Sequence, residues 1–249
     1  MSIAPTNFKY VWLLWASTFM LPWSILYILA PTVRRLMIRA SLATAAFGLT
    51  EPFFVPAYWN PPTLLDLAQR TGFDIESLIF CFAIGGIAAV SYRVITASPD
   101  MAMDHALRRV GRHRWHLGAL VAPFPIFFLL VYLPWNPIYP AVVALFAGAL
   151  AAVLCRPDLL RNSLWGGVIF LALYLVFLLG LRRIWPGYIE AVWNLPKLLP
   201  WRPMGLPSEE LLFGLGIGLY WSCVYEHLAW RRGRINAVLR IAGSEIPHI

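Results

Sequence analysis

Two stretches of the chain decide its fold, GFDIESLIFCFAIGGIAAVSY at residues 72–92 and GLPSEELLFGLGIGLYWSCVY at residues 205–225. They align without gaps, and in both a glycine is followed by a glutamate and then by a long apolar run. A helix needs roughly 20 apolar residues to cross a bilayer. Each stretch therefore predicts a membrane-spanning helix with a carboxylate in its first turn, at Glu76 and Glu209.

The composition indicates that the whole chain is built from such helices. Of the 249 residues, 60% are hydrophobic and only 13% are charged, whereas an ordinary soluble domain has about 25% charged residues. Apolar runs predict about seven membrane helices, at residues 8–30, 32–55, 75–97, 117–133, 139–155, 164–181 and 207–230. We therefore expect an all-α, multi-pass membrane helix bundle, surrounded by membrane lipid and located in the inner membrane if the organism is a bacterium.

The excess of basic residues fits a membrane topology better than nucleic-acid binding. The net charge of +8 comes almost wholly from arginines. These gather after the first, third and fifth predicted helices and in the C-terminal tail, so the positive-inside rule predicts a cytoplasmic C-terminus. The arginine-rich loop also contains three histidines, and contact with anionic lipid explains this loop better than a metal: His105, His113 and His116.

Few other residues suggest a cofactor or a metal. Cys81, Cys155 and Cys223 lie in apolar stretches, where we expect buried thiols rather than disulfides or metal ligands. The sequence contains no zinc-ligand spacing, Walker loop or Ser/His/Asp set, and we expect neither a metal nor a cofactor. The glycine pair Gly214 and Gly218 predicts close helix packing rather than phosphate binding, and we expect a surface ion pair from Glu226 with the adjacent histidine.

A second similarity extends the first. PFFVPAYWNPPTLL at residues 52–65 resembles PGYIEAVWNLPKLL at residues 186–199, so that a W-N-x-P loop precedes each glutamate-led helix. The two helices lie four apart in order and thus enter the membrane in the same direction. This predicts a parallel internal repeat (3+1+3) in a single domain over residues 1–249, with units at about 8–97 and 139–230 joined by a helix at 117–133. Parallel repeats commonly form a site at their interface.

The adjacent carboxylates Glu209 and Glu210 are the strongest candidates for chemistry. A helix dipole favours acidic residues in the first turn, which is a purely structural explanation for both. The functional interpretation is that they enter an apolar cavity, where burial raises a carboxyl pKa and allows one group to hold a proton near neutral pH. Ionisable residues within a membrane are by default candidates for function. Glu76 is the equivalent candidate in the first half.

Further candidates surround these acids. Asp74 suits an N-cap. Glu51 ends the second predicted helix, where a carboxylate opposes the dipole; it either marks a site or simply extends into water. The loop residues have two interpretations, anchoring at the membrane interface or an aromatic lid over a cationic intermediate. The loop and helix residues that we assign to substrate binding with Glu51 and Asp74 are Trp59, Asn60, Trp193, Asn194, Phe80 and Phe213.

The motif P-S-E-E-L-L-F at residues 207–213 resembles the P-x-E-E-x-x-F signature of the lycopene cyclase domain family of membrane-embedded carotenoid cyclases. These occur as heterodimers in some bacteria and as fused domains in fungi and archaea, and their two-copy build is similar to the repeat above. The resemblance covers residues 50–92 and 186–226. This chain departs from the pattern in its first copy, where Asp74 replaces the expected proline and Ser77 the second acid.

The resemblance implies a redox-neutral, cofactor-independent isomerisation. An acid protonates the terminal double bond of a linear carotenoid or other isoprenoid, a nearby double bond attacks the cation, and a base removes a proton. Carried over to this chain, the proton-transfer residues are Glu209 and Glu210, with Glu76 contributing from the other copy. Two alternatives stay open: a small membrane transporter or lipid-binding protein, and an inactive cyclase-like assembly partner. A membrane-protein partner or a homo-oligomer is compatible with each.

Overall fold

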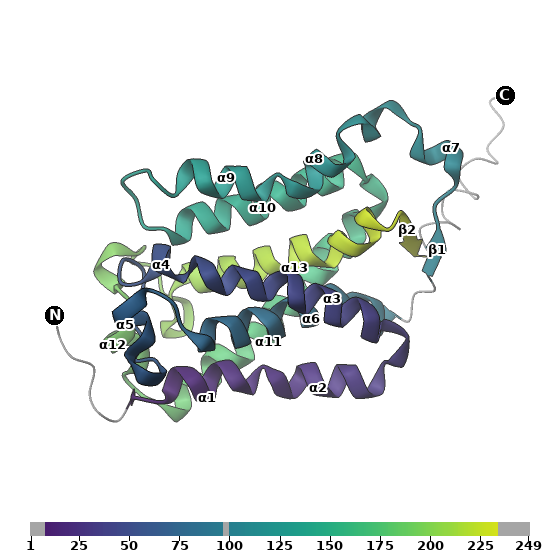
Figure 1. Ribbon diagram of the computed structural model, residues 1–249. Coiled ribbons are helices and arrows are strands. Elements are labelled where there is room, and N and C mark those ends of the chain that lie inside the picture. Colours follow the sequence, from purple (N-terminus) through teal and green to yellow (C-terminus); the bar gives the residue numbers. More distant parts are fainter. Residues whose placement is uncertain (1–7, 97–99, 234–249) are drawn as a thin grey trace.

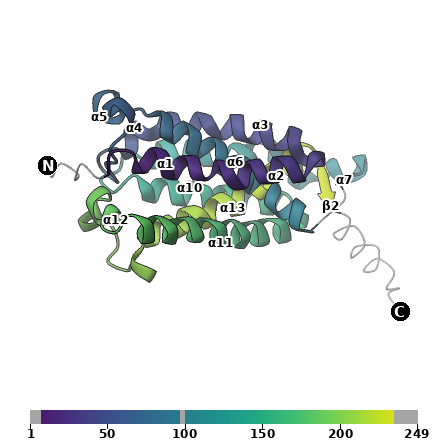
Figure 2. The same ribbon diagram turned by 90° about the horizontal axis from the view of Figure 1, so that it is seen from below.

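The computed structural model describes residues 8–96 and 100–233, which form a bundle of helices running alongside one another (Figures 1 and 2). The α-helices of the first half and the connecting region are α1 (Val11–Thr18), α2 (Met20–Leu29), α3 (Arg34–Ala45), α4 (Glu51–Phe54), α5 (Leu67–Thr71), α6 (Ile75–Thr96), α7 (His105–Arg108), α8 (His116–Val121) and α9 (Pro123–Leu130). Those of the second half are α10 (Ile138–Cys155), α11 (Leu160–Ile184), α12 (Tyr188–Val192) and α13 (Ser208–Leu228). The 3₁₀ turns are Pro31–Val33, Ala46–Thr50, Leu64–Asp66, Gly111–Trp115, Pro157–Leu159, Leu195–Lys197 and Pro203–Gly205.

The predicted all-helical architecture is confirmed in its coarse form. In the described part of the chain, 4 helical segments are long and apolar enough to cross a membrane: Val11–Leu29, Ile75–Thr96, Ile138–Cys155 and Pro157–Ile184. The last predicted helix is present as α13, but it carries Glu209, Glu210 and Glu226, which lower its hydropathy. The count of about seven spans and the internal repeat therefore stay predictions.

Three of the predicted helices are interrupted, and the first, at residues 8–30, divides at Phe19 into α1 and α2. The segment at residues 117–133 is split into α8 and α9, with Pro123 as the first residue of the second piece. Proline cannot donate the helical hydrogen bond at that position, so the helix breaks there. The segment at residues 32–55 tightens into a 3₁₀ turn after Ala45 and resumes as the single turn α4. Glu51 is the first residue of that turn, so our premise that it ends a helix is wrong.

The centre of the bundle is formed by α6 and α13, which pack against each other. In the first half α6 packs on α3, and in the second half α13 packs on α11 and α10. Glycines allow these close approaches, because a Cβ at Gly85 would overlap the side chain of Thr44, and one at Gly218 would overlap the backbone of Gly166. Helix packing by Gly214 and Gly218 is thus confirmed.

The two ends of the bundle differ in structure. At one end the W-N-x-P loops meet in an antiparallel bridge between Trp59 and Trp193, close to α5 and α12 (Figure 1). At the other end lie α7 and a short antiparallel pair, β1 (Asp100–Ala102) and β2 (Arg231–Gly233) (Figure 1).

The structure also corrects one expectation at this second end. Glu226 and His227 are buried, with exposures of 3% and 0%, rather than forming a surface pair. Glu226 lies 3.7 Å from Arg93. The C-terminal tail beyond residue 233, whose arginines contributed to the predicted cytoplasmic orientation, lies outside the described residues.

Candidate active site

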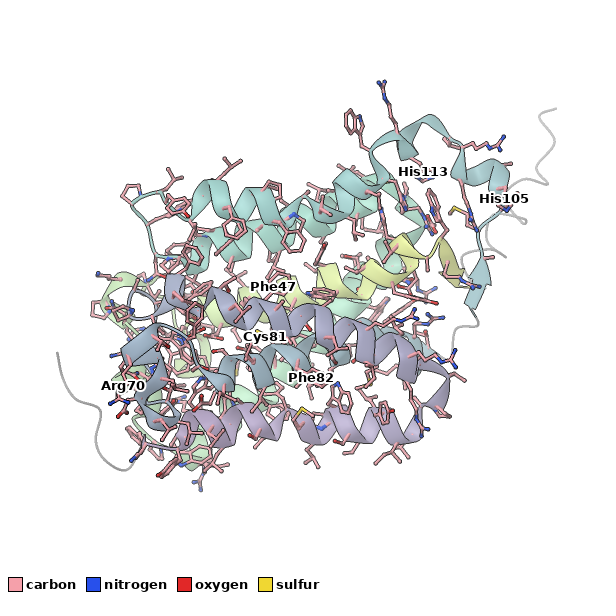
Figure 3. All side chains as sticks on the ribbon, in the orientation of Figure 1. Phe47, Arg70, Cys81, Phe82, His105 and His113 are labelled. Carbon is pink, nitrogen blue, oxygen red and sulfur yellow. The ribbon has the colours of Figure 1, made fainter. Side chains whose placement is uncertain are left out.

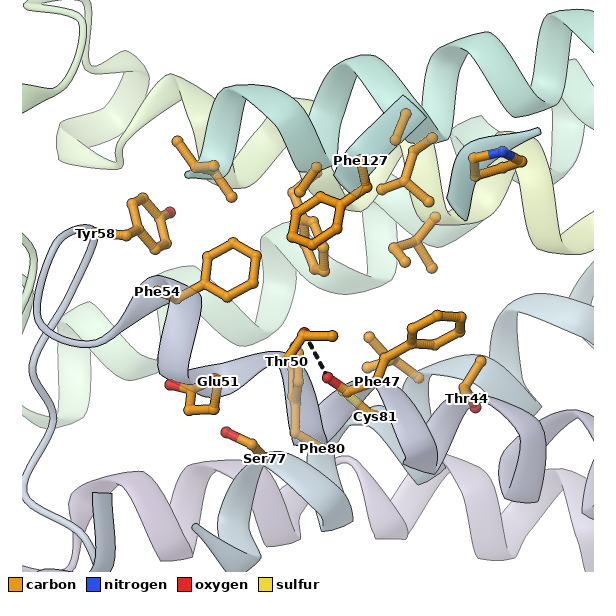
Figure 4. Close-up of a pocket in the computed structure, with 18 of the residues that line it drawn as sticks. Thr44, Phe47, Thr50, Glu51, Phe54, Tyr58, Ser77, Phe80, Cys81 and Phe127 are labelled. Carbon is orange, nitrogen blue, oxygen red and sulfur yellow. Dashed lines mark hydrogen bonds between the residues drawn. The ribbon is translucent and has the colours of Figure 1, made fainter. Parts of the chain in front are cut away.

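An elongated cavity of about 480 Å³ lies between the two halves of the bundle. Its wall is contributed by α1, α3, α4, α6, α9, α10, α11 and α13, together with both W-N-x-P loops. Along α13 the lining extends from Glu210 to Trp221, which at about 1.5 Å per residue corresponds to a length of roughly 16 Å. Figure 4 shows Phe54 and Phe127 facing this space from opposite sides. The wall is predominantly aromatic and aliphatic, and its two carboxyl groups are those of Glu51 and Glu210.

Glu210 is held by three hydrogen-bond donors. The Tyr58 hydroxyl and the Trp193 indole N–H donate to one carboxylate oxygen, at 2.5 Å and 2.9 Å. The Tyr174 hydroxyl donates to the other oxygen at 2.5 Å. Burial raises the pKa of Tyr58 well above its ordinary value, and the charge of Glu210 raises it further, so this phenol keeps its proton and remains a donor. Hydrogen bonds of this kind stabilise the charged form of a carboxyl group.

Glu51 is the second carboxyl group in the cavity and has fewer donors. Its carboxylate accepts the indole N–H of Trp59 at 2.7 Å and is only 7% exposed. Ser77 lies beside it (Figure 4), at the position that aligns with Glu210 in the other half. A carboxyl group in an apolar wall with few donors favours its neutral form. Glu51 thus lies next to Ser77, which occupies the position of the second acid in the first half.

Glu209 and Glu76 are fully buried but do not line the cavity. Glu209 accepts the backbone N–H of Leu199 at 2.8 Å and the Tyr139 hydroxyl at 2.9 Å. Glu76 accepts the backbone N–H of Leu64 at 2.7 Å. In each half, the glutamate therefore ties the segment that follows the W-N-x-P loop to the start of the central helix.

The remaining predicted polar residues also lie outside the cavity lining. Asp74 accepts hydrogen bonds from the backbone N–H and the hydroxyl of Ser77, as an N-cap does, and also from the Trp12 indole. Burial raises the pKa of the Asp74 carboxyl group. Asn194 donates its side-chain amide to the carbonyl of Ala57, and Asn60 accepts from Gln69. These three residues organise the loops around the cavity.

The aromatic candidates do reach the cavity. Trp59, Trp193, Phe80 and Phe213 all line it. The indole rings of Trp59 and Trp193 lie 5.2 Å apart and bind Glu51 and Glu210 respectively, so they act as donors inside the site. The π-faces in this wall are suited to stabilising a carbocation.

Sequence reasoning missed several residues of the site. Tyr58 directly precedes the W-N-x-P loop, and this position is the signal that links it to the site. Tyr174 lies in the apolar middle stretch of α11, and a single tyrosine hydroxyl in such a stretch is a signal for a buried polar partner. Trp12 and Trp15 come from the first helix and carry no motif.

This arrangement places two groups that can exchange protons in a predominantly apolar cavity. One carboxyl group with three donors and one with fewer occupy the same apolar cavity, so hydrogen bonds favour the charged form more strongly at Glu210 than at Glu51. Such a pair can act as acid and base within one reaction.

A comparison with known families matches part of the chain. The family described as lycopene cyclase matches residues 136–228, which contain α10, α11, α12 and α13. Comparisons with curated proteins and with solved structures found no match.

Proposed function

We propose that this chain, which belongs to the lycopene cyclase family through residues 136–228, is a membrane-embedded carotenoid or isoprenoid cyclase that acts by proton-initiated, redox-neutral cyclisation. The observation that carries this proposal is the placement of Glu51 and Glu210 in one aromatic-lined cavity between the two halves. Such a cavity suits the end of a hydrophobic polyene, because apolar walls bury hydrocarbon and keep water away from a cationic intermediate.

We assign the proton donor to Glu51 and the base to Glu210. The Glu51 carboxyl group gives its proton to the terminal double bond of the substrate, which leaves a carbocation at the neighbouring carbon. A second double bond attacks this carbon and closes the ring, and Glu210 removes a proton to form the final double bond. One proton is added and one is removed, so the product is an isomer of the substrate. The proton then returns from Glu210 to Glu51 before the next turnover.

The assignment changes the roles of two glutamates. Glu209 and Glu76, which the family resemblance implies as proton-transfer residues, act in this proposal as positioning residues that hold the loops bearing Trp193 and Trp59. The support is their hydrogen bonding to backbone N–H groups of Leu199 and Leu64. Their side chains influence the reaction by positioning the loops, and they do not contact the substrate directly.

The experiment is expression of the chain in cells that accumulate lycopene or another linear isoprenoid, followed by chromatographic analysis of the extracted products. The wild type should yield a cyclised isomer, and Glu210→Gln and Glu51→Gln should each lower its yield by about 10²–10⁴-fold, the usual contribution of a general acid or base. Glu190→Gln is the matched control, because Glu190 is exposed on α12. Equal amounts of each variant in the membrane fraction must be verified.

Two outcomes would contradict the proposal. One is the absence of any cyclised product from the wild type with either class of substrate, as expected of an inactive assembly partner or a transporter. The other is undiminished product from both variants of the cavity carboxyl groups.

A further inference from the structure

A second cluster of reactive side chains lies at the opposite end of the bundle from the W-N-x-P loops. It contains His113 in the 3₁₀ turn before α8, His116 at the start of α8 and Cys155 at the end of α10. The Cys155 sulfur lies 3.4 Å from Nδ1 of His113 and 3.5 Å from Nδ1 of His116. Figure 3 shows His113 at the end of the bundle away from Arg70.

The spacing of these donor atoms fits a metal site. One ligand atom from each residue lies within 4.8 Å of the other two. A tetrahedral zinc ion has Zn–S and Zn–N distances of about 2.3 Å and 2.0–2.1 Å, which places the sulfur and a nitrogen about 3.5 Å apart. The two sulfur–nitrogen distances here match that separation. Two imidazoles and one thiolate are also a ligand set that zinc accepts.

The second nitrogen of His116 is held as a metal ligand requires. Its Nε2 lies 2.9 Å from the backbone carbonyl oxygen of His227. A carbonyl only accepts, so Nε2 carries the proton and the lone pair of the neutral ring is on Nδ1, facing Cys155. Metal-bound histidines almost always donate their other N–H in this manner.

The orientation of this ring is fixed from both faces. The His116 ring is stacked between the rings of His227, at 3.9 Å, and Trp230, at 3.7 Å. His116 and Cys155 are also largely buried, with exposures of 7% and 6%. A ligand held in this way loses little conformational freedom when a metal binds.

The nearby charges permit a cation. The neighbouring Arg156 is held by both carboxylate oxygens of Asp158, at 2.9 Å and 2.7 Å, which offsets its charge. Cys155 is the last residue of α10, and the C-terminal end of a helix carries a partial negative charge that favours a cation.

We propose that His113, His116 and Cys155 bind a zinc ion, with a water molecule as the fourth ligand. This site revises our expectation that Cys155 is only a buried thiol and that the histidine-containing loop only contacts lipid. The ion would join the 3₁₀ turn and α8 to the end of α10. The site is independent of the carboxyl groups in the cavity, so it can be tested without measuring cyclisation.

The test uses the full chain, purified in detergent with an affinity tag that contains no histidine. Zinc is measured by mass spectrometry, and thiolate–metal bonding by the charge-transfer absorption that appears when cobalt(II) replaces zinc. The wild type should contain one zinc per chain and show the cobalt–thiolate band. Cys155→Ser should lose that band, and His113→Asn should bind zinc more weakly by at least the 10–100-fold typical of losing even a second-shell partner.

His105→Asn is the matched control, because His105 belongs to the same arginine-rich segment but is exposed on α7. It should retain one zinc per chain. His113 is only partly buried, so His113→Asn keeps the test valid if Cys155→Ser fails to fold. Zinc far below one per chain in a wild type supplied with zinc would overturn the proposal, since Cys155 and the two rings would then share hydrogen bonds only. Full zinc retention in His113→Asn would overturn it equally.

Discussion

In both tryptophan–carboxylate pairs of the cavity an indole N–H donates to a glutamate, but the two glutamates come from different positions in their halves. In the second half, Trp193 donates to Glu210, which follows Glu209 in the first turn of α13. In the first half, Trp59 donates to Glu51, which comes from α4 and lies 26 positions before Ser77, the residue aligned with Glu210. The loop and its indole are thus alike in both halves, whereas the carboxyl group comes from a different element.

The number of hydrogen-bond donors, rather than the residue type, distinguishes the roles of the two acids. Glu210 accepts from two tyrosines and a tryptophan, whereas Glu51 accepts the indole of Trp59 and lies beside Ser77. A carboxylate with more donors is better stabilised in its charged form. The proposed acid and base therefore follow from the asymmetry between the halves.

The largest expected effect comes from removing Glu51, and a second substitution then places an acid at Ser77, the position aligned with Glu210. Glu51→Ala should lower the yield of cyclised product by about 10²–10⁴-fold, because it removes the proposed proton donor. Adding Ser77→Glu in the space vacated by Glu51 should recover at least about tenfold of this loss. The measurement is product yield per amount of membrane-inserted protein. A double variant as inactive as Glu51→Ala, although folded, would show that the geometry of α4 itself is required.

A smaller effect should distinguish the two tryptophans. Trp59→Phe removes the indole donor of Glu51, whereas Trp193→Phe leaves Glu210 with both tyrosine donors. Leaving a buried polar group without its hydrogen-bond partner costs about 1–3 kcal/mol, so Trp59→Phe should lower the initial rate roughly 10-fold, and Trp193→Phe less because two donors remain. Equal losses in both variants would contradict the distinction drawn from donor number.

The glutamates that hold the loops should affect stability more than chemistry. Glu209→Ala and Glu76→Ala each leave a backbone N–H without its acceptor, at a cost of about 1–3 kcal/mol. Glu209 also accepts from Tyr139 and Ser208, so its removal should cause the larger fall in the thermal unfolding midpoint in detergent. A variant that unfolds like the wild type but has lost all activity would instead indicate a direct catalytic role.

The smallest effect is expected at Asp74. Burial raises the pKa of this carboxyl group in the folded protein, so the folded state binds the proton more tightly than the unfolded state. Its contribution to stability is complete below the unfolded pKa and is lost as pH rises through the folded pKa. Asp74→Asn keeps the N-cap and should remove this dependence. The difference in unfolding midpoint between the variant and the wild type should therefore grow with pH, and a constant difference would contradict the assignment.

Much of the architecture could be predicted from the sequence because apolar runs report membrane helices directly. The interruptions are harder to predict: Pro123 marks one, but the 3₁₀ turn before Glu51 contains Gly48, which packs closely on the backbone of Ser77 and Leu78. No local pattern encodes that contact.

The candidate site was predictable in its residues but not in its geometry. The sequence pointed to Glu209 and Glu210 together, yet adjacent helical residues point in different directions, and only Glu210 lines the cavity. The sequence indicates Glu51 only through its expected position at a helix end, whereas its position beside Ser77 depends on tertiary packing. The donors Tyr58 and Tyr174 come from separate elements, and only the folded chain brings them to one carboxylate.

The bridge between Trp59 and Trp193 also constrains how the chain can evolve. Asn60 donates its backbone N–H to the carbonyl of Val192, and Asn194 donates to that of Tyr58. Because main-chain atoms form these contacts, the bridge itself persists through side-chain substitutions in either loop as long as both segments stay extended. An insertion in one loop, by contrast, shifts the register and requires a compensating change in the other. Duplication, fusion or fission of the gene would preserve the cavity only if the two loops kept matching lengths.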